Sequence, residues 1–158
     1  MRCNIITIAF FVLLSGCVGQ DVARKDACER TINLYARHVD LGEPERVVEL
    51  FTADARWQLG ETKLQGRDAI RKHFFALNDD TSRVSRHSQA NVVLDWYSGS
   101  EARGTVYLTL YMGSKKESGF AEMAGQPLFV GHYEDEYVYE DSVCLIRSRN
   151  VIPAFVAQ

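Results

Sequence analysis

The order of the helical and strand patterns is the feature that most limits the folds open to this chain. Apolar residues recur at helical spacing over residues 21–39 and again over residues 67–77. Segments typical of long strands then follow one another, at about residues 83–97, 102–112, 127–140 and 142–152. No helical segment separates them, so the crossover helices that a parallel sheet needs are missing. The sequence therefore predicts an α+β fold with helices on one face of an antiparallel sheet.

Shorter signals complete this outline. Gly42 predicts the end of the first helix, and Pro44 predicts the start of a second, short one. Residues 55–59 are typical of a short strand, and Gly66 precedes the third helix. A chain of 158 residues has room for one core but hardly for two. We therefore expect a single domain over residues 25–158.

The charge balance excludes one class of partner. The chain has 18 Lys and Arg residues against 21 Asp and Glu residues, and its isoelectric point is about 5.8. Such a chain has no basic field to attract phosphates, so we expect no nucleic-acid partner.

The N-terminal residues have a composition of their own. Arg2 precedes an apolar run over residues 5–14, and the small residues Ser15 and Gly16 follow it. A membrane-spanning helix needs roughly 20 apolar residues, so this run predicts a targeting segment.

The segment Leu14-Ser15-Gly16-Cys17 resembles the lipobox of bacterial lipoproteins. The resemblance implies a signal peptide over residues 1–16, a lipid such as palmitate on Cys17, and a flexible tether over residues 17–24. It also implies an envelope protein that contacts the membrane through its lipid only. Val18 stands where an aspartate would imply inner-membrane retention, so the resemblance favours the periplasmic side of the outer membrane. The alternative is an ordinary cleaved signal.

Cys28 and Cys144 are the cysteines that remain in the predicted domain. Disulfides persist outside the cytoplasm, but this spacing carries no information about pairing. A disulfide and two free buried cysteines are both open alternatives.

Several phrases in the predicted domain resemble the SnoaL-like branch of the nuclear-transport-factor-two-like superfamily. They are Tyr35, Asp40, residues 50–55, residues 66–70, His87 with Asn91, residues 131–135 and Arg149. The resemblance implies a cystatin-like fold: a cone-shaped barrel of a curved antiparallel sheet with three N-terminal helices packed in its concave face. It also implies a homodimer. Members include dehydratases, isomerases and proteins without catalysis, so the fold alone does not decide the function.

In this resemblance His87 and Asp40 fall on the positions of a pocket histidine and the acid that orients it. A neutral imidazole can take a proton from carbon, and a carboxylate on its other nitrogen stabilises the imidazolium that forms. Tyr35 is the third catalytic candidate, while Tyr133 and Arg149 are donors for developing negative charge. The implied activity is a cofactor-independent, dehydratase-like lyase or isomerase acting on a small hydrophobic ring-containing molecule.

An apolar pocket with a few polar groups is typical of small-ligand sites. The substrate-binding candidates are Tyr133, Arg149, Tyr111, Trp57 and Phe74, and further apolar lining is expected from Phe75, Leu108, Leu110, Met112 and Phe129. We expect no metal, because the histidines at positions 38, 73, 87 and 132 lack the spacing of zinc ligands. We also expect His38, His73 and His132 to face solvent.

Three features count against a catalytic site. The dehydratases carry a second His or Asp where this chain has residues 110–112, so Tyr111 or Tyr107 would have to donate the proton. On an unbroken strand His87 lies opposite the apolar face of Val92 and Leu94, unless a bulge near Ser88 intervenes. Finally, positions 35 and 40 point about 140° apart on a helix, unless that helix is ending.

Structural alternatives therefore stay open. Asp40 and His87 could be ordinary surface or core residues, and Arg149 could pair with Asp135 or Glu134 across strands. Tyr133, Tyr137 and Tyr139 share one side of a strand and are candidates for a dimer contact. A hydrophobic-ligand-binding lipoprotein without catalysis and a dimeric scaffold are the alternative functions.

Overall fold

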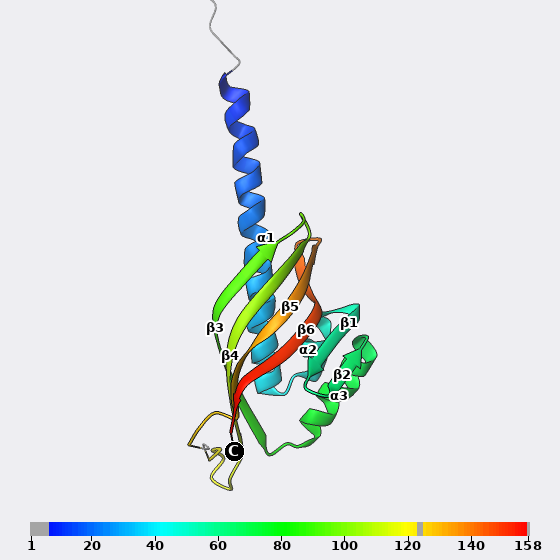
Figure 1. Cartoon of the computed structure of the whole chain (residues 1–158), viewed down its shortest axis with the longest axis vertical. Coiled ribbons are helices and arrows are strands. Elements are labelled where there is room, and N and C mark those ends of the chain that lie inside the picture. The colour runs from blue at the N-terminus through cyan, green and yellow to red at the C-terminus, as the bar shows by residue number, and fades with distance from the viewer. Residues whose placement is uncertain (1–6, 123–124, 158) are drawn as a thin grey trace, which may run out of the picture.

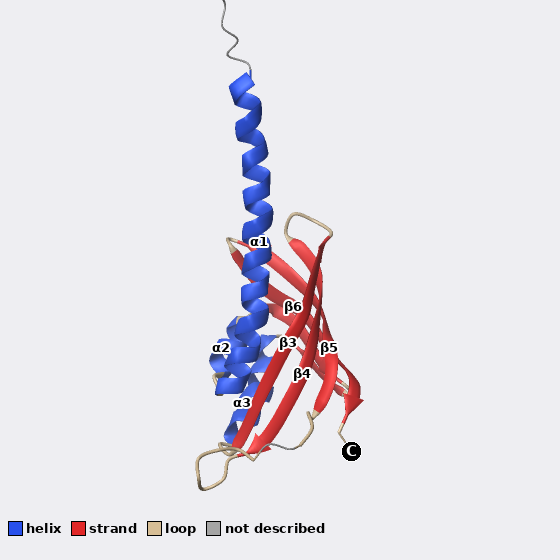
Figure 2. Cartoon of the chain, turned by 90° about the vertical axis from the view of Figure 1, so that its left-hand side faces the viewer, coloured by secondary structure: helices blue, strands red, loops and turns tan. Residues whose placement is uncertain are grey.

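A curved sheet with helices on its concave side makes up the domain (Figures 1 and 2). The computed structural model describes residues 7–122 and 125–157. The helices are α1 (Thr7–Leu41), α2 (Pro44–Glu49) and α3 (Arg67–Asp79). The strands are β1 (Phe51–Leu59), β2 (Thr62–Gln65), β3 (Arg83–Trp96), β4 (Glu101–Ser114), β5 (Phe129–Glu140) and β6 (Val143–Val156). The α+β class is thus confirmed, with an open sheet in place of a closed barrel.

The six strands are ordered β2-β1-β6-β5-β4-β3. The neighbours β3–β4, β4–β5 and β5–β6 are antiparallel, as expected for consecutive long strands with no helix between them. The pair β1–β6 is parallel, which differs from the predicted all-antiparallel sheet. No local turn joins these two strands, so no turn geometry dictates their relative direction.

The short strands differ most from the expectation. Strand β1 begins at Phe51 rather than at residue 55, because Phe51 is buried beside Ile146 of β6. Strand β2 was not predicted, and it pairs with β1 through a turn at Gly60, whose φ is +55°. With only one half-buried apolar residue, Leu64, this strand has no alternating pattern to reveal it.

Helix α1 ends where the sequence predicted. Gly42 has φ +68°, and the Glu43 amide donates to the His38 carbonyl at 2.9 Å. A Cβ atom on Gly42 would lie 2.5 Å from Oδ1 of Asn78 in α3. Glycine therefore both ends α1 and permits the close approach of α3.

The N-terminal half of α1 replaces the expected flexible tether. The helix is continuous through residues 17–24. Arg24 packs 4.4 Å from the ring centre of Trp96 and donates to the Gly99 carbonyl at 3.2 Å. Within the described residues, no helix is long and apolar enough to cross a membrane. The lipid on Cys17 remains a prediction, as does the signal peptide over residues 1–16, whose first six residues lie outside the described residues.

A disulfide joins Cys28 of α1 to Cys144 of β6, with their Cα atoms 4.9 Å apart. Both cysteines are buried, and the Thr31 hydroxyl donates to the Cys144 carbonyl at 2.6 Å beside them. This bond decides between the two alternatives left open by the sequence. The bond links α1 covalently to strand β6 and so holds the helix against the sheet.

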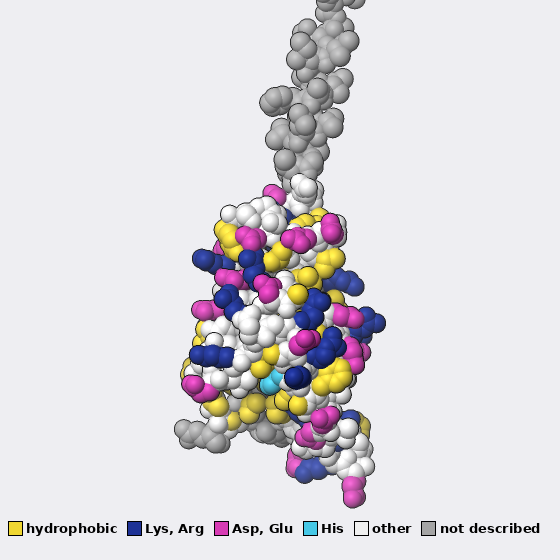
Figure 3. All heavy atoms as spheres, turned by 90° about the vertical axis from the view of Figure 1, so that its right-hand side faces the viewer, with side chains coloured by type: hydrophobic (Ala, Val, Ile, Leu, Met, Phe, Trp, Pro, Cys, Tyr) yellow, Lys and Arg dark blue, Asp and Glu magenta, His cyan; other side chains and the backbone are white. Residues whose placement is uncertain are grey.

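Acidic and basic side chains are intermixed on the face of the domain that Figure 3 shows. This distribution agrees with the charge balance of the sequence, which offers no field of one sign.

Candidate active site

Asp40 and His87 are in direct contact. Asp40 lies in the last turn of α1, and His87 lies on β3, an edge strand. Nδ1 of His87 is 2.6 Å from Oδ1 of Asp40, and the His87 amide donates to Oδ2 at 2.8 Å. The Ser85 hydroxyl also donates to Oδ1, at 2.8 Å. An edge strand has amides that no neighbouring strand uses, which is why Asp40 can bind this backbone as well as the ring.

The environment of Asp40 favours its carboxylate form. Burial acts to raise the pKa of Asp40, but the hydrogen bonds from His87 and Ser85 and the His87 charge outweigh it, so this pKa lies below its ordinary value. A carboxylate only accepts hydrogen bonds, so Nδ1 of His87 carries a proton and, in the neutral ring, Nε2 keeps its lone pair. None of the hydrogen bonds among the described residues uses Nε2. In the neutral ring, Nε2 is therefore the nitrogen left to accept a proton, which is the arrangement that a general base requires.

A bulge in β3 turns His87 inward together with the apolar residues. Two residues of β3, Asn91 and Val92, lie opposite one residue of β4, and Asn91 has φ +48°. Before the bulge Ser85 and His87 face the interior, and after it Val92 and Leu94 do. The parity conflict is resolved by this bulge, which lies three residues beyond the predicted position near Ser88.

Tyr35 faces the core, whereas Asp40, in the last turn of α1, faces strand β3. The ring centres of Tyr35 and His87 are 6.5 Å apart, and Nε1 of Trp57 donates to the Tyr35 hydroxyl at 3.1 Å. Burial raises the pKa of Tyr35, so its phenol stays protonated. A buried neutral phenol close to the imidazole is thus present.

Arg149 forms the centre of the interior. Its side chain is 0% exposed, and its guanidinium carbon lies 4.0 Å from the ring centres of both Tyr35 and Tyr133. Nε and Nη2 donate to the two carboxylate oxygens of Asp135 at 2.9 and 2.6 Å, and the Tyr137 hydroxyl donates to the same carboxylate. Nη1 has no partner among the described residues. Arg149 therefore forms the cross-strand pair with Asp135 that the sequence left open. This pair holds in place the guanidinium that was expected to act as a donor.

Several sequence-predicted residues lie elsewhere than expected. Tyr111 is 38% exposed and pairs with Arg86, so it lies on the sheet face opposite His87; Tyr107, also exposed, lies on that face too. Neither can replace the missing proton donor. Trp57 lies within the core, in contact with Phe74, whereas Phe74 also lines the cavity that adjoins Asp40. Strand alternation explains the placement of Tyr111 and Tyr107, because one residue of shift moves a side chain to the other face.

The proposed tyrosine dimer contact is also wrong. Tyr133 and Tyr137 are buried and Tyr139 packs against the same core, so this side of β5 faces α1 rather than a partner.

Two of the histidines expected in solvent are enclosed. His38 is buried, and its Nδ1 lies 2.5 Å from Oε2 of Glu43. His73 is half-buried, with its ring centre 5.0 Å from that of Trp57, and burial lowers the pKa of His73. His132 is partly exposed, as expected.

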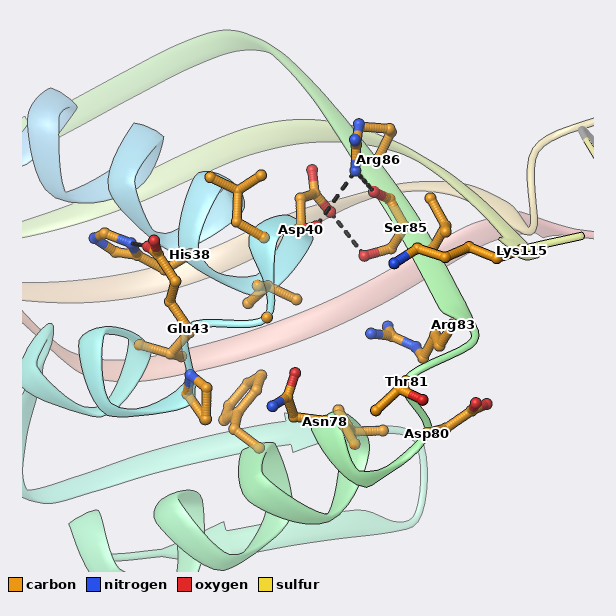
Figure 4. A pocket seen from close by; sticks show the side chains of 18 residues that line it. His38, Asp40, Glu43, Asn78, Asp80, Thr81, Arg83, Ser85, Arg86 and Lys115 are labelled. Carbon is orange, nitrogen blue, oxygen red and sulfur yellow. Dashed lines mark hydrogen bonds and ion pairs between the residues drawn. The ribbon is translucent and has the colours of Figure 1, made fainter. Parts of the chain in front are cut away.

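A cavity of about 370 Å³ adjoins the Asp40–His87 pair (Figure 4). It lies between the end of α1, the α2–α3 pair and the start of β3, and Asp40 and Ser85 form part of its wall. His87 does not line it, although its imidazole contacts Asp40, which does. Ser85 was not predicted as a site residue, although it shares the strand face of His87. Tyr111 lines a second cavity, of about 410 Å³, together with Met112 and Pro127.

No metal site accompanies these residues in the part of the chain that the structure describes: residues 7–122 and 125–157 contain no group of three or more His, Cys, Asp or Glu side chains placed to hold an ion.

Comparisons with known proteins agree with this architecture. A candidate scytalone dehydratase from Novosphingobium aromaticivorans superposes with a TM-score of 0.76, at 22% identity over 89% of this chain and 90% of that chain. A hexachlorocyclohexane dehydrochlorinase from Novosphingobium barchaimii gives a TM-score of 0.71, at 16% identity over 87% and 91%. A cystatin-like protein of unknown function from Nostoc punctiforme gives 0.65, at 18% identity over 83% and 92%.

At these identities the structures establish the fold alone, and no curated protein matches the chain. The model of the SnoaL-like domain, however, matches residues 20–150, which is most of the sequence. The chain therefore belongs to the SnoaL-like domain family.

Proposed function

We propose that this protein is a cofactor-independent lyase or isomerase of the dehydratase type, acting on a small hydrophobic ring-containing molecule. The observation that carries the proposal is the contact between Asp40 and Nδ1 of His87 in an interior of aromatic side chains. The dehydratase and dehydrochlorinase among the similar structures act by name on ring compounds, which supports this substrate class.

In the proposed reaction Nε2 of His87 takes a proton from a ring carbon, and Asp40 stabilises the imidazolium that forms. The leaving group or developing enolate needs a hydrogen-bond donor. The candidates for this donor are the Tyr35 phenol, the Tyr133 phenol and Nη1 of Arg149, which has no partner among the described residues. No step requires a metal or an organic cofactor.

Turnover of a panel of steroid, polyketide and terpenoid alcohols, followed by mass spectrometry of the dehydrated product, tests this proposal. Replacing a general base costs about 10²–10⁴-fold in rate, so His87→Gln should lower kcat by that factor while ligand affinity changes little. Asp40→Asn should also lower kcat. The matched control is His132→Gln, at a histidine on the opposite face of the sheet, and it should leave kcat unchanged. Undiminished turnover by His87→Gln would refute the proposal.

Ligand binding without catalysis is the second candidate. It is favoured by the lining of the 370 Å³ cavity, which reaches Asp40 and Ser85 but stops short of the imidazole. Saturable binding without any product from the panel, unchanged in His87→Gln, would support this candidate.

We also propose that the protein is anchored to the cell envelope through a lipid on Cys17 and forms a homodimer. The sequence Leu14-Ser15-Gly16-Cys17 supports the anchor, and the Cys28–Cys144 disulfide suits a compartment outside the cytoplasm. The exposed sheet face that bears Tyr107 is the surface for a second copy. Incorporation of labelled palmitate that Cys17→Ser abolishes tests the anchor, and sedimentation of the purified protein tests the dimer.

A further inference from the structure

The cavity beside Asp40 has an apolar floor and a charged rim. Val47, Phe74 and Leu77 form its apolar part, and they belong to or pack against the core. Charged side chains come from two sides of it: His38 of α1 and Glu43 just before α2 on one side, and Arg83 and Arg86 of β3 with Lys115, the residue after β4, on the other (Figure 4). A volume of about 370 Å³ is within the range of small-molecule sites.

The acids of this rim are already compensated by the protein. Asp40 accepts from Ser85 and His87, and Glu43 lies 2.5 Å from the His38 ring. Asp80 accepts from the Ser82 hydroxyl at 2.7 Å and from its amide at 3.0 Å. The pKa values of all three carboxyl groups lie below their ordinary values. For Glu43 and Asp80 these hydrogen bonds are the largest cause. For Asp40 burial acts to raise the pKa, but the hydrogen bonds and the His87 charge together outweigh it. Each acid therefore stays charged and has its hydrogen-bond donors in place.

The cations of the rim are not compensated in this way. Arg83 and Lys115 take part in no ion pair or side-chain hydrogen bond among the described residues, although the Arg83 charge lies near enough to Asp80 to help lower the pKa of that carboxyl group. Nη1 of Arg86 donates to two backbone carbonyls, those of Ser85 and Asp40, rather than to a carboxylate. In Figure 4 the side chains of Arg83 and Lys115 extend from the strand side toward the middle of the cavity. Two positive charges that no carboxylate among the described residues binds directly thus line the cavity together with Val47, Phe74 and Leu77.

We infer that this cavity binds an amphiphilic organic acid, with its carboxylate held by Arg83 and Lys115 and its ring against Val47, Phe74 and Leu77. A guanidinium and an ammonium on one side of a partly enclosed site give a carboxylate charge-assisted hydrogen bonds. The inference extends the proposed function, since it makes the substrate a ring-bearing acid, but the binding step is measured without turnover.

The test is calorimetric titration of the full-length protein with 2-naphthoate and with its neutral isostere naphthalene-2-carboxamide, at low salt. The acid should bind at least about tenfold more tightly than the amide, which corresponds to 1.4 kcal/mol at 25 °C. In the double variant Arg83→Gln/Lys115→Gln this preference should fall to about twofold or less, with affinity for the amide unchanged. Added salt should also weaken the preference, because partly exposed charges are screened.

Lys116→Gln is the matched control, since Lys116 is the next residue, binds Glu122 at 2.7 Å and does not line the cavity. It should retain the full preference for the acid. Equal binding of acid and amide by the unmodified protein would overturn the inference, as would binding of neither probe or a preference that survives in the double variant. Because none of these measurements depends on His87, the inference can fail while dehydratase activity stands, and the reverse also holds.

Discussion

The disulfide between Cys28 and Cys144 supports the sharpest stability prediction. The two cysteines are separated by 116 residues in sequence, so the bridge closes a long loop in the unfolded chain. In the chain-entropy model a loop of roughly 100 residues corresponds to about 4.7 kcal/mol of stabilisation. The variant Cys28→Ala/Cys144→Ala removes the bridge without burying a polar group. We expect its free energy of unfolding to fall by about 4–5 kcal/mol and its melting temperature by about 10–15 °C.

Calorimetry and urea unfolding of the unmodified protein and the double variant measure this difference. Mass spectrometry after thiol labelling shows whether the disulfide is present. Burial of both sulfurs adds a control, because a reductant cannot reach them while the protein is folded. Dithiothreitol should therefore leave the native protein bridged, whereas unfolding and refolding in dithiothreitol should give the melting temperature of the double variant. A difference below about 3 °C, or free thiols in the native protein, would refute the entropic argument.

Three further predictions follow from the interior contacts. Asp135→Asn leaves the buried Arg149 without a counter-charge and should cost about 3–5 kcal/mol in urea unfolding, whereas Asp135→Leu/Arg149→Met should recover much of this loss; a single variant as stable as the double would contradict it. Gly42→Ala should cost about 1–2 kcal/mol because φ is +68° there and Asn78 is close, while Gly99→Ala, in open space, should melt like the unmodified protein. Because the pKa of Asp40 is lowered in the fold, the ionised carboxylate stabilises the protein at pH values above 3.8, the ordinary pKa of this group. This stabilisation is lost as the pH falls through the folded-state pKa. Unmodified protein should therefore exceed Asp40→Asn in stability at pH 7 by about 2 kcal/mol and lose that advantage toward pH 2, so an advantage that is independent of pH would count against the assignment.

The parts of the fold that sequence could predict are those set by local patterns. Helical spacing before residue 41, the glycine at position 42 and long alternating strands after residue 83 are local signals, and the structure follows them. The parallel pairing of β1 with β6 and the Cys28–Cys144 bond join distant segments, so no local pattern encodes them.

The site was predictable to a similar degree. The family resemblance pointed to Asp40 and His87, but the bulge at Asn91 that turns His87 inward depends on one backbone angle. Asp135 carried a signal that was misassigned: it shares the strand face of Tyr133 and Tyr137, and that face is inside. Arg83 and Lys115 form no ion pair within the described part of the chain, and the sequence could not reveal this, since ion pairing depends on which acids the fold brings into contact.

The length of α1 determines where a ligand would come from. If a lipid holds Cys17 at the bilayer, the 23 residues to Asp40 span about 35 Å along the helix axis. With α1 upright on the bilayer, the opening beside Asp40 would then stand away from the lipid surface and face the aqueous space beyond it. Molecules dissolved in the bilayer would have no direct route to this opening, and ligands would arrive through water.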